Sequence, residues 1–174
     1  MSAAFSEEKA VGIIIERRKL TNPWQEFGWS TVAVVIDPPE SLALGRLLEQ
    51  GEDWARFYAG LLPIELHRRH TASYRDNMMT GRPQVYVVLR KSEGTGELDY
   101  HPVLATIAPD EAQIYLDTGE DLVDTVAMPE PVQAWVDRFI DTHHVEAPVY
   151  KRQRKPYDPR KGGMPGQGPG RGGS

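Results

Sequence analysis

The chain has 174 residues, 40% of them hydrophobic, no cysteine, and a formal net charge of −5. This length and composition predict one globular domain that buries its own core. The lack of cysteine excludes disulfides, a thiolate nucleophile, iron–sulfur clusters and cysteine-ligated zinc.

The charge is divided unevenly along the chain. Residues 151–174 hold seven Lys or Arg and one acid, a net +6, which leaves residues 1–150 with 13 basic and 24 acidic residues, a net −11. An acidic body is a poor surface for nucleic acid.

The segment 1–10 has Glu7 and Glu8 where a signal peptide has a basic region, and the longest apolar runs are strand-length. We therefore expect a cytoplasmic protein without a membrane span.

The first half of the chain predicts strands and one short helix. Residues 1–10 are expected to be flexible, and the β-branched run 11–20 predicts a strand that ends at the turn Asn22-Pro23. Residues 30–37 predict a second strand, stopped by two prolines. Three leucines at helical spacing predict a short helix over 40–51.

The second half predicts two hairpins and then helices. Alternation over 53–69, interrupted by Gly60, predicts one hairpin, and residues 84–91 with 98–107 predict another. Between them, 70–79 predicts a helical turn or two. Helices are expected over 109–117 and within 128–145, where Val132, Trp135, Val136, Phe139 and Ile140 form one apolar stripe.

These elements predict an α+β fold over residues 11–150, with a mainly antiparallel sheet of about six strands and two C-terminal helices packed on it. Residues 151–174 are rich in Gly and Pro and have almost nothing to bury, so they predict a disordered basic tail. The tail is interpreted either as solubilising or as a binding segment for an acidic protein surface or nucleic acid.

The polar residues predict no complete catalytic site. His67, His70, His101 and the pair His143 and His144 are not spaced as metal ligands, and no glycine-rich loop between a strand and a helix is available for a nucleotide. No Gly-x-Ser-x-Gly context occurs for a serine nucleophile. We therefore expect no metal, no cofactor and no catalytic residues.

Several separate motifs resemble an uncharacterised bacterial family. They are ERRKLTNPWQ, WARFYAGLLPIELHRRHTASYRDNM, VYVVLR and the long segment from APDEAQIYLDTGEDL to EAPVYKR, and together they cover about residues 11–155. The resemblance implies a gene neighbourhood of molybdenum-dependent formate dehydrogenase and its maturation factors. Some relatives carry the label of molybdopterin-guanine dinucleotide biosynthesis proteins.

The resemblance implies a non-enzymatic accessory protein that binds a protein partner, a molybdenum enzyme or its maturation factor. Two alternatives stay open: a nucleotidyltransferase-like enzyme of molybdopterin cofactor biosynthesis, and a nucleic-acid-binding regulator that acts through the tail. The residue types that dominate binding hot spots are Trp, Tyr and Arg. On this basis the predicted partner-binding residues are Trp24, Gln25, His67, Arg68, Arg69, His70, Tyr74 and Arg75. For Trp24 the sequence also allows burial at the end of the sheet.

Overall fold

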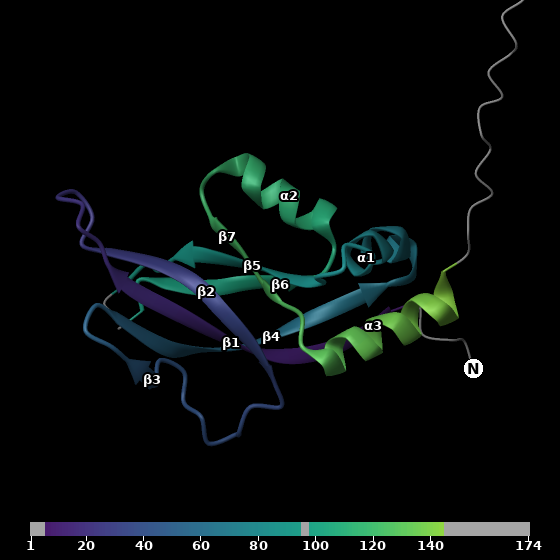
Figure 1. Cartoon of the computed structure of the whole chain (residues 1–174), viewed down its shortest axis with the longest axis horizontal. Helices are drawn as coiled ribbons and strands as arrows, with labels where there is room; N and C mark the ends of the chain where they lie inside the picture. The colour runs from purple at the N-terminus through teal and green to yellow at the C-terminus, as the bar shows by residue number, and fades with distance from the viewer. Residues whose placement is uncertain (1–5, 95–97, 145–174) are drawn as a thin grey trace, which may run out of the picture. The chain divides into compact units, whose positions relative to one another are not determined.

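The computed structural model of the protein describes residues 6–94 and 98–144 (Figure 1). The chain divides into a unit Met1–His144 and a unit Val145–Ser174. The predicted disordered tail belongs to the second unit and lies outside the described residues. In the described part, seven strands, three α-helices and one 3₁₀-helix confirm the α+β class, but the strands form two antiparallel sheets where one was expected.

Sheet A has the strand order β2-β1-β4-β3. Its members are β1 (Ser6–Lys19), β2 (Phe27–Ile36), β3 (Leu47–Gln50) and β4 (Trp54–His67). The central strand β1 carries the β-branched run predicted from the sequence, and the side chains of Val11, Ile13 and Ile15 are fully buried. Such residues pack well on a pleated surface, which favours a central strand.

Sheet B has the strand order β6-β5-β7. Its members are β5 (Gln84–Lys91), β6 (Tyr100–Thr106) and β7 (Leu122–Ala127). The sheet is centred on β5, whose Val85, Val87 and Leu89 are fully buried. β5 and β6 form the hairpin predicted from the sequence.

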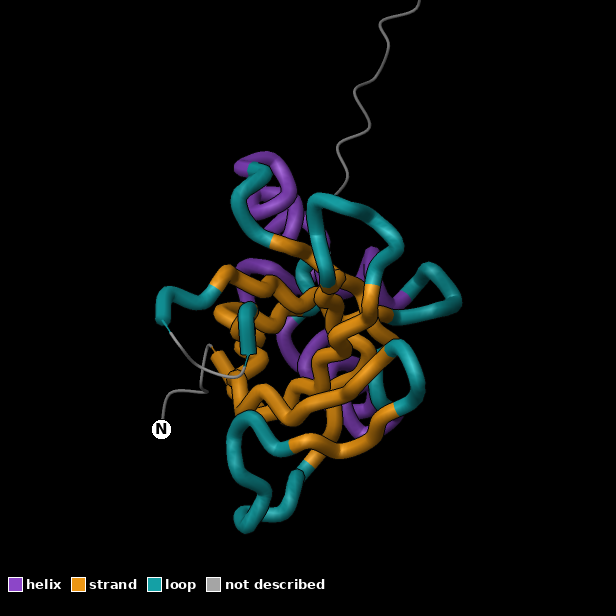
Figure 2. Tube along the Cα trace, turned by 90° about the vertical axis from the view of Figure 1, so that its left-hand side faces the viewer, coloured by secondary structure: helices purple, strands orange, loops and turns teal. Residues whose placement is uncertain are grey.

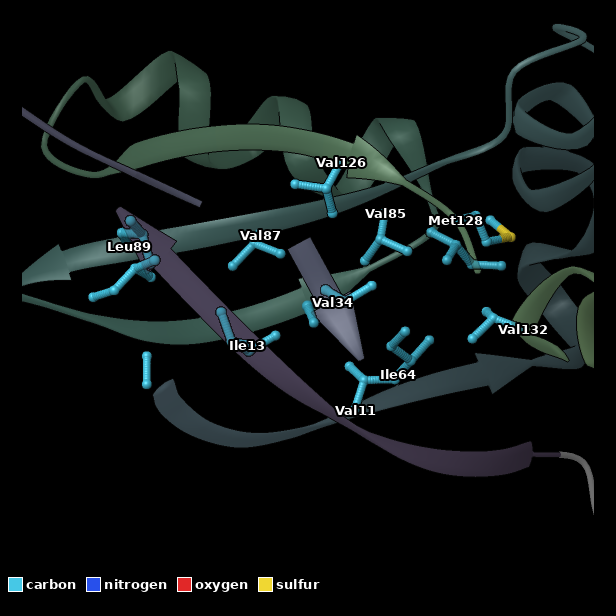
Figure 3. Packing of buried hydrophobic residues seen from close by; sticks show 14 of the residues in the cluster. Val11, Ile13, Val34, Ile64, Val85, Val87, Leu89, Val126, Met128 and Val132 are labelled. Atoms are coloured by element: carbon cyan, nitrogen blue, oxygen red, sulfur yellow. The ribbon is translucent and has the colours of Figure 1, made fainter. Parts of the chain in front are cut away.

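The core lies between the two sheets. Figure 3 shows Val11 and Ile13 of β1 facing Val85 and Val87 of β5 across this space, with Met128 and Val132 at one end. In addition, β4 lies beside β6 and β2 beside β7, so each sheet protects an edge of the other. Burying one apolar face of each sheet is the main driving force of such a two-layer fold.

The helices lie around the sheets. The 3₁₀-helix η1 (Arg68–His70) leads from β4 into α1 (Thr71–Met78), and α1 packs against α3 (Glu130–His143) at one end of the strands (Figure 1). The helix α2 (Pro109–Thr118) lies against sheet B and connects β6 to β7. The predicted stripe of α3 is confirmed, because Val132, Trp135, Val136 and Phe139 are buried. In the described part of the chain, no helix is long and apolar enough to cross a membrane.

The predicted helix over 40–51 is wrong. Gly45 has a φ of +87°, and its N–H donates to the carbonyl of Tyr58, while the Tyr58 N–H donates to the carbonyl of Arg46. The segment thus pairs with β4 and forms the edge strand β3, all of whose residues are exposed. The backbone pairing with β4 decides the conformation of this segment, although its leucines have helical spacing.

The predicted hairpin over 53–69 is also wrong, because β4 is one continuous strand of 14 residues. Ala59 and Gly60 together oppose Ile13 of β1, so the glycine, with a φ of +103°, marks a β-bulge and not a turn. A bulge and a hairpin use the same residue type at the same place, which is why the sequence did not distinguish them.

Two further differences concern the ends of the predicted elements. Residues 6–10, expected to be flexible, belong to β1 and pair with residues 63–67 of β4. The strand β7, which the sequence did not predict, follows α2, so the two last helices do not close the chain together. The alternation of β7 is weak, with only Val126 buried, and its pairing with β5 supplies the missing stability.

A buried amide joins α1 to sheet B. The Asn77 side chain is 2% exposed; its Nδ2 donates to the carbonyls of Gln84 (2.7 Å) and Ile107 (2.9 Å), and its Oδ1 accepts from the Gln84 N–H (3.0 Å). These backbone groups lie where β5 begins and just after β6 ends. One side chain therefore satisfies three backbone polar groups in two segments.

We predict that Asn77→Ala lowers the free energy of unfolding by about 2 to 4 kcal/mol, because it leaves buried backbone groups without partners. Asn77→Asp should also destabilise, since a carboxylate cannot donate to the two carbonyls. The matched control is Asp76→Asn on the exposed side of the same helix, with a change within about 0.5 kcal/mol. Urea denaturation measures all three, and an Asn77→Ala protein as stable as the control would contradict the assignment.

A second polar contact bridges the two sheets. The Thr31 N–H of β2 donates to Oδ2 of Asp124 in β7 at 2.8 Å. Burial raises the pKa of Asp124 from its ordinary 3.8, and the bond from Thr31 offsets this only in part. Between 3.8 and the raised pKa the folded protein binds a proton that the unfolded chain has lost, so this carboxyl contributes less stability as the pH rises through that window.

We predict that Asp124→Asn equals or exceeds the stability of the unsubstituted protein at neutral pH. The amide oxygen can still accept from Thr31, and no charge is buried. The stability difference between the two proteins should grow as the pH rises through the window and then level off. Thermal unfolding over a pH series measures this, and a loss of more than about 1 kcal/mol at neutral pH would show that the charged acceptor is needed.

Candidate functional site

The predicted site residues fall into two groups at opposite ends of sheet A. Trp24 and Gln25 lie in the turn between β1 and β2, while residues 67–75 follow the far end of β4 (Figure 1). The strand β4, whose Trp54 pairs with Arg18 near that turn, has 14 residues. At about 3.3 Å per residue it spans roughly 40 Å, so the two groups do not form one continuous surface.

Trp24 is 90% exposed, which rules out the alternative that it closes the end of the sheet. Its turn is nevertheless held by hydrogen bonds. The Asn22 Oδ1 accepts from the Trp24 N–H at 2.9 Å, the Gln25 Nε2 donates to the carbonyl of Phe27 at 2.9 Å, and the Leu20 N–H donates to the carbonyl of Glu26 at 2.9 Å. The asparagine contact is the local side-chain bond typical of such turns. The indole is thus presented to solvent by a well-bonded turn.

Trp24 borders an open groove of about 630 Å³, here called the aromatic groove. Its walls come from the β1–β2 turn, the start of β2 and the facing ends of β5 and β6. They include Trp24, Gln25, Glu26, Phe27, Trp29, Lys91, Asp99 and Tyr100. Seen from this end, the connecting loops gather around the strand ends, and α1 and α3 lie behind the strands (Figure 2). Loops on a rigid scaffold commonly carry binding residues.

Aromatic rings and one cation close the core beneath this groove. The Trp29 ring lies 6.0 Å from the ring of Phe57 and 6.5 Å from that of Tyr100. The Arg17 guanidinium stands over Phe27 at 4.7 Å, with the Phe57 and Trp29 rings at 5.3 Å and 5.9 Å. These are attractive cation–π distances. The arrangement holds the aromatic floor in a fixed geometry.

One donor in this cluster has no partner. Trp29 is 7% exposed, and within the described residues its indole Nε1 makes no hydrogen bond. A buried donor without an acceptor costs about 1 to 3 kcal/mol, and such groups in native proteins call for an explanation.

The second group borders a pocket of about 410 Å³, here called the histidine pocket. One wall carries His67, Arg69 and His70; the opposite wall carries Asp110 and Glu111 at the start of α2, and Leu62, Leu104 and Ile114 supply apolar surface. The volume is within the usual range for small-ligand sites.

The polar groups of the histidine pocket bind largely to one another. His67 Nε2 lies 3.3 Å from a Glu65 carboxylate oxygen, and the Thr106 hydroxyl donates to Glu111 at 2.9 Å. The Ser73 hydroxyl donates to Asp110 at 2.5 Å, and this bond lowers the pKa of Asp110 below its ordinary 3.8. Three carboxylates therefore lie among the basic side chains, and the pocket has no single sign of charge with which to select an ion.

Tyr74, one of the predicted partner-binding residues, lies in the core. It is 2% exposed, its ring packs against Phe139 at 6.3 Å, and its hydroxyl accepts from the His67 N–H at 2.9 Å. Burial raises its pKa above the ordinary 10.0. The tyrosine is therefore part of the α1–α3 contact and is not available to a partner.

The remaining arginines lie near α1. Arg75 is half-buried, with Nη1 3.3 Å from Nε2 of His144, and Arg68 is exposed, with its carbonyl accepting from the Thr71 hydroxyl at 3.3 Å. No three acidic or histidine side chains in residues 6–94 and 98–144 gather closely enough to hold a metal ion. The α1 end of the molecule therefore holds the α1–α3 contact and the histidine pocket, whose polar groups bind one another.

Sequence reasoning missed the residues that β5 and β6 bring to the aromatic groove. Lys91 of β5 pairs with Tyr100 of β6, and Asp99 directly precedes β6. Their position opposite the β1–β2 turn depends on how the two sheets pack, for which the sequence offers no local signal.

The family described as "Protein of unknown function (DUF3305)" matches residues 10–154, and the chain belongs to this family. The expectation of an uncharacterised family is thereby confirmed. No curated protein and no solved structure matches the chain.

We predict that Ser73→Ala raises the pKa of Asp110 toward its ordinary 3.8, because the bond from Ser73 is the largest cause of the lowered value. A carboxyl whose pKa is lowered in the folded state stabilises the protein at a pH above its unfolded-state pKa. This stabilisation is lost as the pH falls through the folded-state pKa. The stability loss at neutral pH should stay below about 1 kcal/mol for this solvent-screened carboxylate. Carboxyl NMR titration measures the pKa; Ser73→Thr, which keeps the hydroxyl, should restore it.

Proposed function

We propose that the protein is a non-enzymatic accessory protein that binds a protein partner during the assembly or cofactor loading of a molybdenum-dependent enzyme such as formate dehydrogenase. The protein-binding part of this proposal is supported by Trp24. The molybdenum part is supported by the resemblance of the sequence motifs to the family found beside those genes.

The exposed indole of Trp24 is the single observation that carries the proposal. Tryptophan is enriched in binding hot spots and is highly buried on average in folded chains. Trp29 and Trp135 follow that average at 7% exposure each, whereas Trp24 is 90% exposed. Because three hydrogen bonds hold the turn, the backbone that carries the indole is already ordered before binding, which favours affinity.

The charge favours a protein partner over a nucleic acid. Residues 1–150 carry a net −11, and in the lining of the aromatic groove two acids, Glu26 and Asp99, stand against one base, Lys91. Phosphates would be repelled from such a surface.

The nucleotidyltransferase-like alternative has less support. A phosphate-binding loop of that kind follows a strand and opens a helix. Here β1 continues through the turn 20–26 into the antiparallel strand β2. The first strand of the described chain therefore lacks the geometry that such a loop requires.

The test is affinity purification of the tagged full-length protein from cells that express the neighbouring formate dehydrogenase. We predict that the dehydrogenase or a maturation factor co-purifies with the unsubstituted protein, and that Trp24→Ala reduces the recovery at least about tenfold, as for a hot-spot residue. Met79→Ala is the matched control, because Met79 is 72% exposed and lies at the α1 end.

Dehydrogenase activity in the same cells gives the second readout. It should fall with Trp24→Ala and stay unchanged with Met79→Ala, while both proteins keep their thermal midpoints. Equal recovery and equal activity for the two variants would contradict a partner-binding role of Trp24. Full dehydrogenase activity in cells that lack the protein would contradict a role in the assembly of this molybdenum enzyme.

A further inference from the structure

Two unusual features occur within the aromatic groove. One is the exposed indole of Trp24, and the other is the buried Trp29, whose Nε1 has no acceptor in the described part of the chain. Both residues line the same groove, together with Phe27 and Tyr100. The groove is therefore lined by aromatic side chains, one of which carries a buried N–H donor without an acceptor among the described residues.

A ligand for this groove has to bring an acceptor and ring-sized apolar groups. The groove is open and its rim is polar, with Gln25, Lys91 and Asp99. Small-molecule sites are mostly apolar and enclose most of their ligand. An extended segment laid across the surface fits an open groove better.

A proline-containing segment has the required chemistry. Polyproline II chains make no internal hydrogen bonds, so their carbonyls are free acceptors, and their pyrrolidine rings pack on aromatic side chains. They are also already extended, which reduces the entropy lost on binding. An uncharged segment of this kind is not repelled by Glu26 and Asp99, whereas a nucleotide phosphate is.

We propose that the aromatic groove docks an extended, proline-containing segment of the partner protein, with Trp24 packing on a proline ring and Trp29 Nε1 donating to a backbone carbonyl. This rests on the proposed function as a protein-binding accessory. The Trp29 nitrogen is covered in the free protein, so an acceptor reaches it after a neighbouring side chain shifts, a change common at interfaces.

The probe is a synthetic decaproline peptide with blocked ends, added to the full-length protein. Its threefold helix presents rings and carbonyls on every side, so the groove can select its own register. A glycine–serine peptide of equal length is the matched control, since it has carbonyls but no rings. Calorimetry should detect decaproline binding at millimolar concentration or below, and no binding of the control.

Two variants separate the roles of the tryptophans. Trp24→Ala should weaken decaproline binding more than about tenfold, as for a hot-spot aromatic. Trp29→Phe keeps a buried ring but removes the N–H, and should weaken binding about three- to tenfold, the effect of one hydrogen bond. Trp135→Phe is the control, because Trp135 is equally buried and lies on α3.

An NMR titration of the unsubstituted protein avoids any dependence on variant folding. The indole N–H signals of Trp24 and Trp29 should shift on addition of decaproline, and that of Trp135 should not. Absence of decaproline binding, binding of both peptides alike, or unshifted Trp24 and Trp29 signals overturns the proposal. So does preferential binding of a nucleotide such as GTP in the groove.

The outcomes distinguish this proposal from the proposed function. If Trp24 is needed for co-purification but decaproline does not bind, the protein-binding role stands and the proline assignment is wrong. If decaproline binds in the groove while Trp24→Ala leaves dehydrogenase activity intact, the groove assignment stands and the accessory role is wrong.

Discussion

The structure depends on the mutual burial of two apolar sheet faces. The cluster that they form together contains Val11, Ile13 and Ile15 of sheet A and Val85, Val87 and Leu89 of sheet B. At about 25 cal/mol per Å² of apolar surface removed from water, this contact outweighs any single polar bond in the protein. The register of β1 follows from it, since a slip by one residue would turn the buried side chains outward.

The two ends of this two-sheet core are closed in different ways. At one end α1 and α3 close the core, and Asn77, Tyr74 and the contacts to His144 satisfy the polar groups there. At the other end no helix of residues 6–94 and 98–144 covers the strands, and rings with the Arg17 guanidinium close the core instead. Within these residues, the buried side-chain donor of Trp29 at the aromatic end has no acceptor.

The sequence predicted those features that depend on neighbouring residues along the chain. The β-branched run of β1 and the apolar stripe of α3 each have a local cause, and the structure agrees. For Trp24 the sequence left exposure and burial open, and the structure shows exposure. The errors occurred where pairing between distant segments decides. Local spacing placed Gly45 within a helix and Gly60 in a hairpin turn. In the structure, the backbone at Gly45 pairs with β4, and Gly60 lies in the pairing of β4 with β1. The predicted site residues were chosen by type alone. They therefore included Tyr74, which the fold buries, and did not include Tyr100, which lines the aromatic groove.

Trp24 and Trp29 are best explained together. An exposed indole is tolerated in the free protein, and a buried donor without an acceptor is tolerated when the fold gains enough elsewhere. Taken singly, each feature calls for no partner. Both occur in one groove, however, and one occupant that covers the first ring and supplies an acceptor to the second removes both costs at once. A binding surface that is complete only with its partner accounts for the pair, whereas a purely structural role for each tryptophan leaves their shared position unexplained.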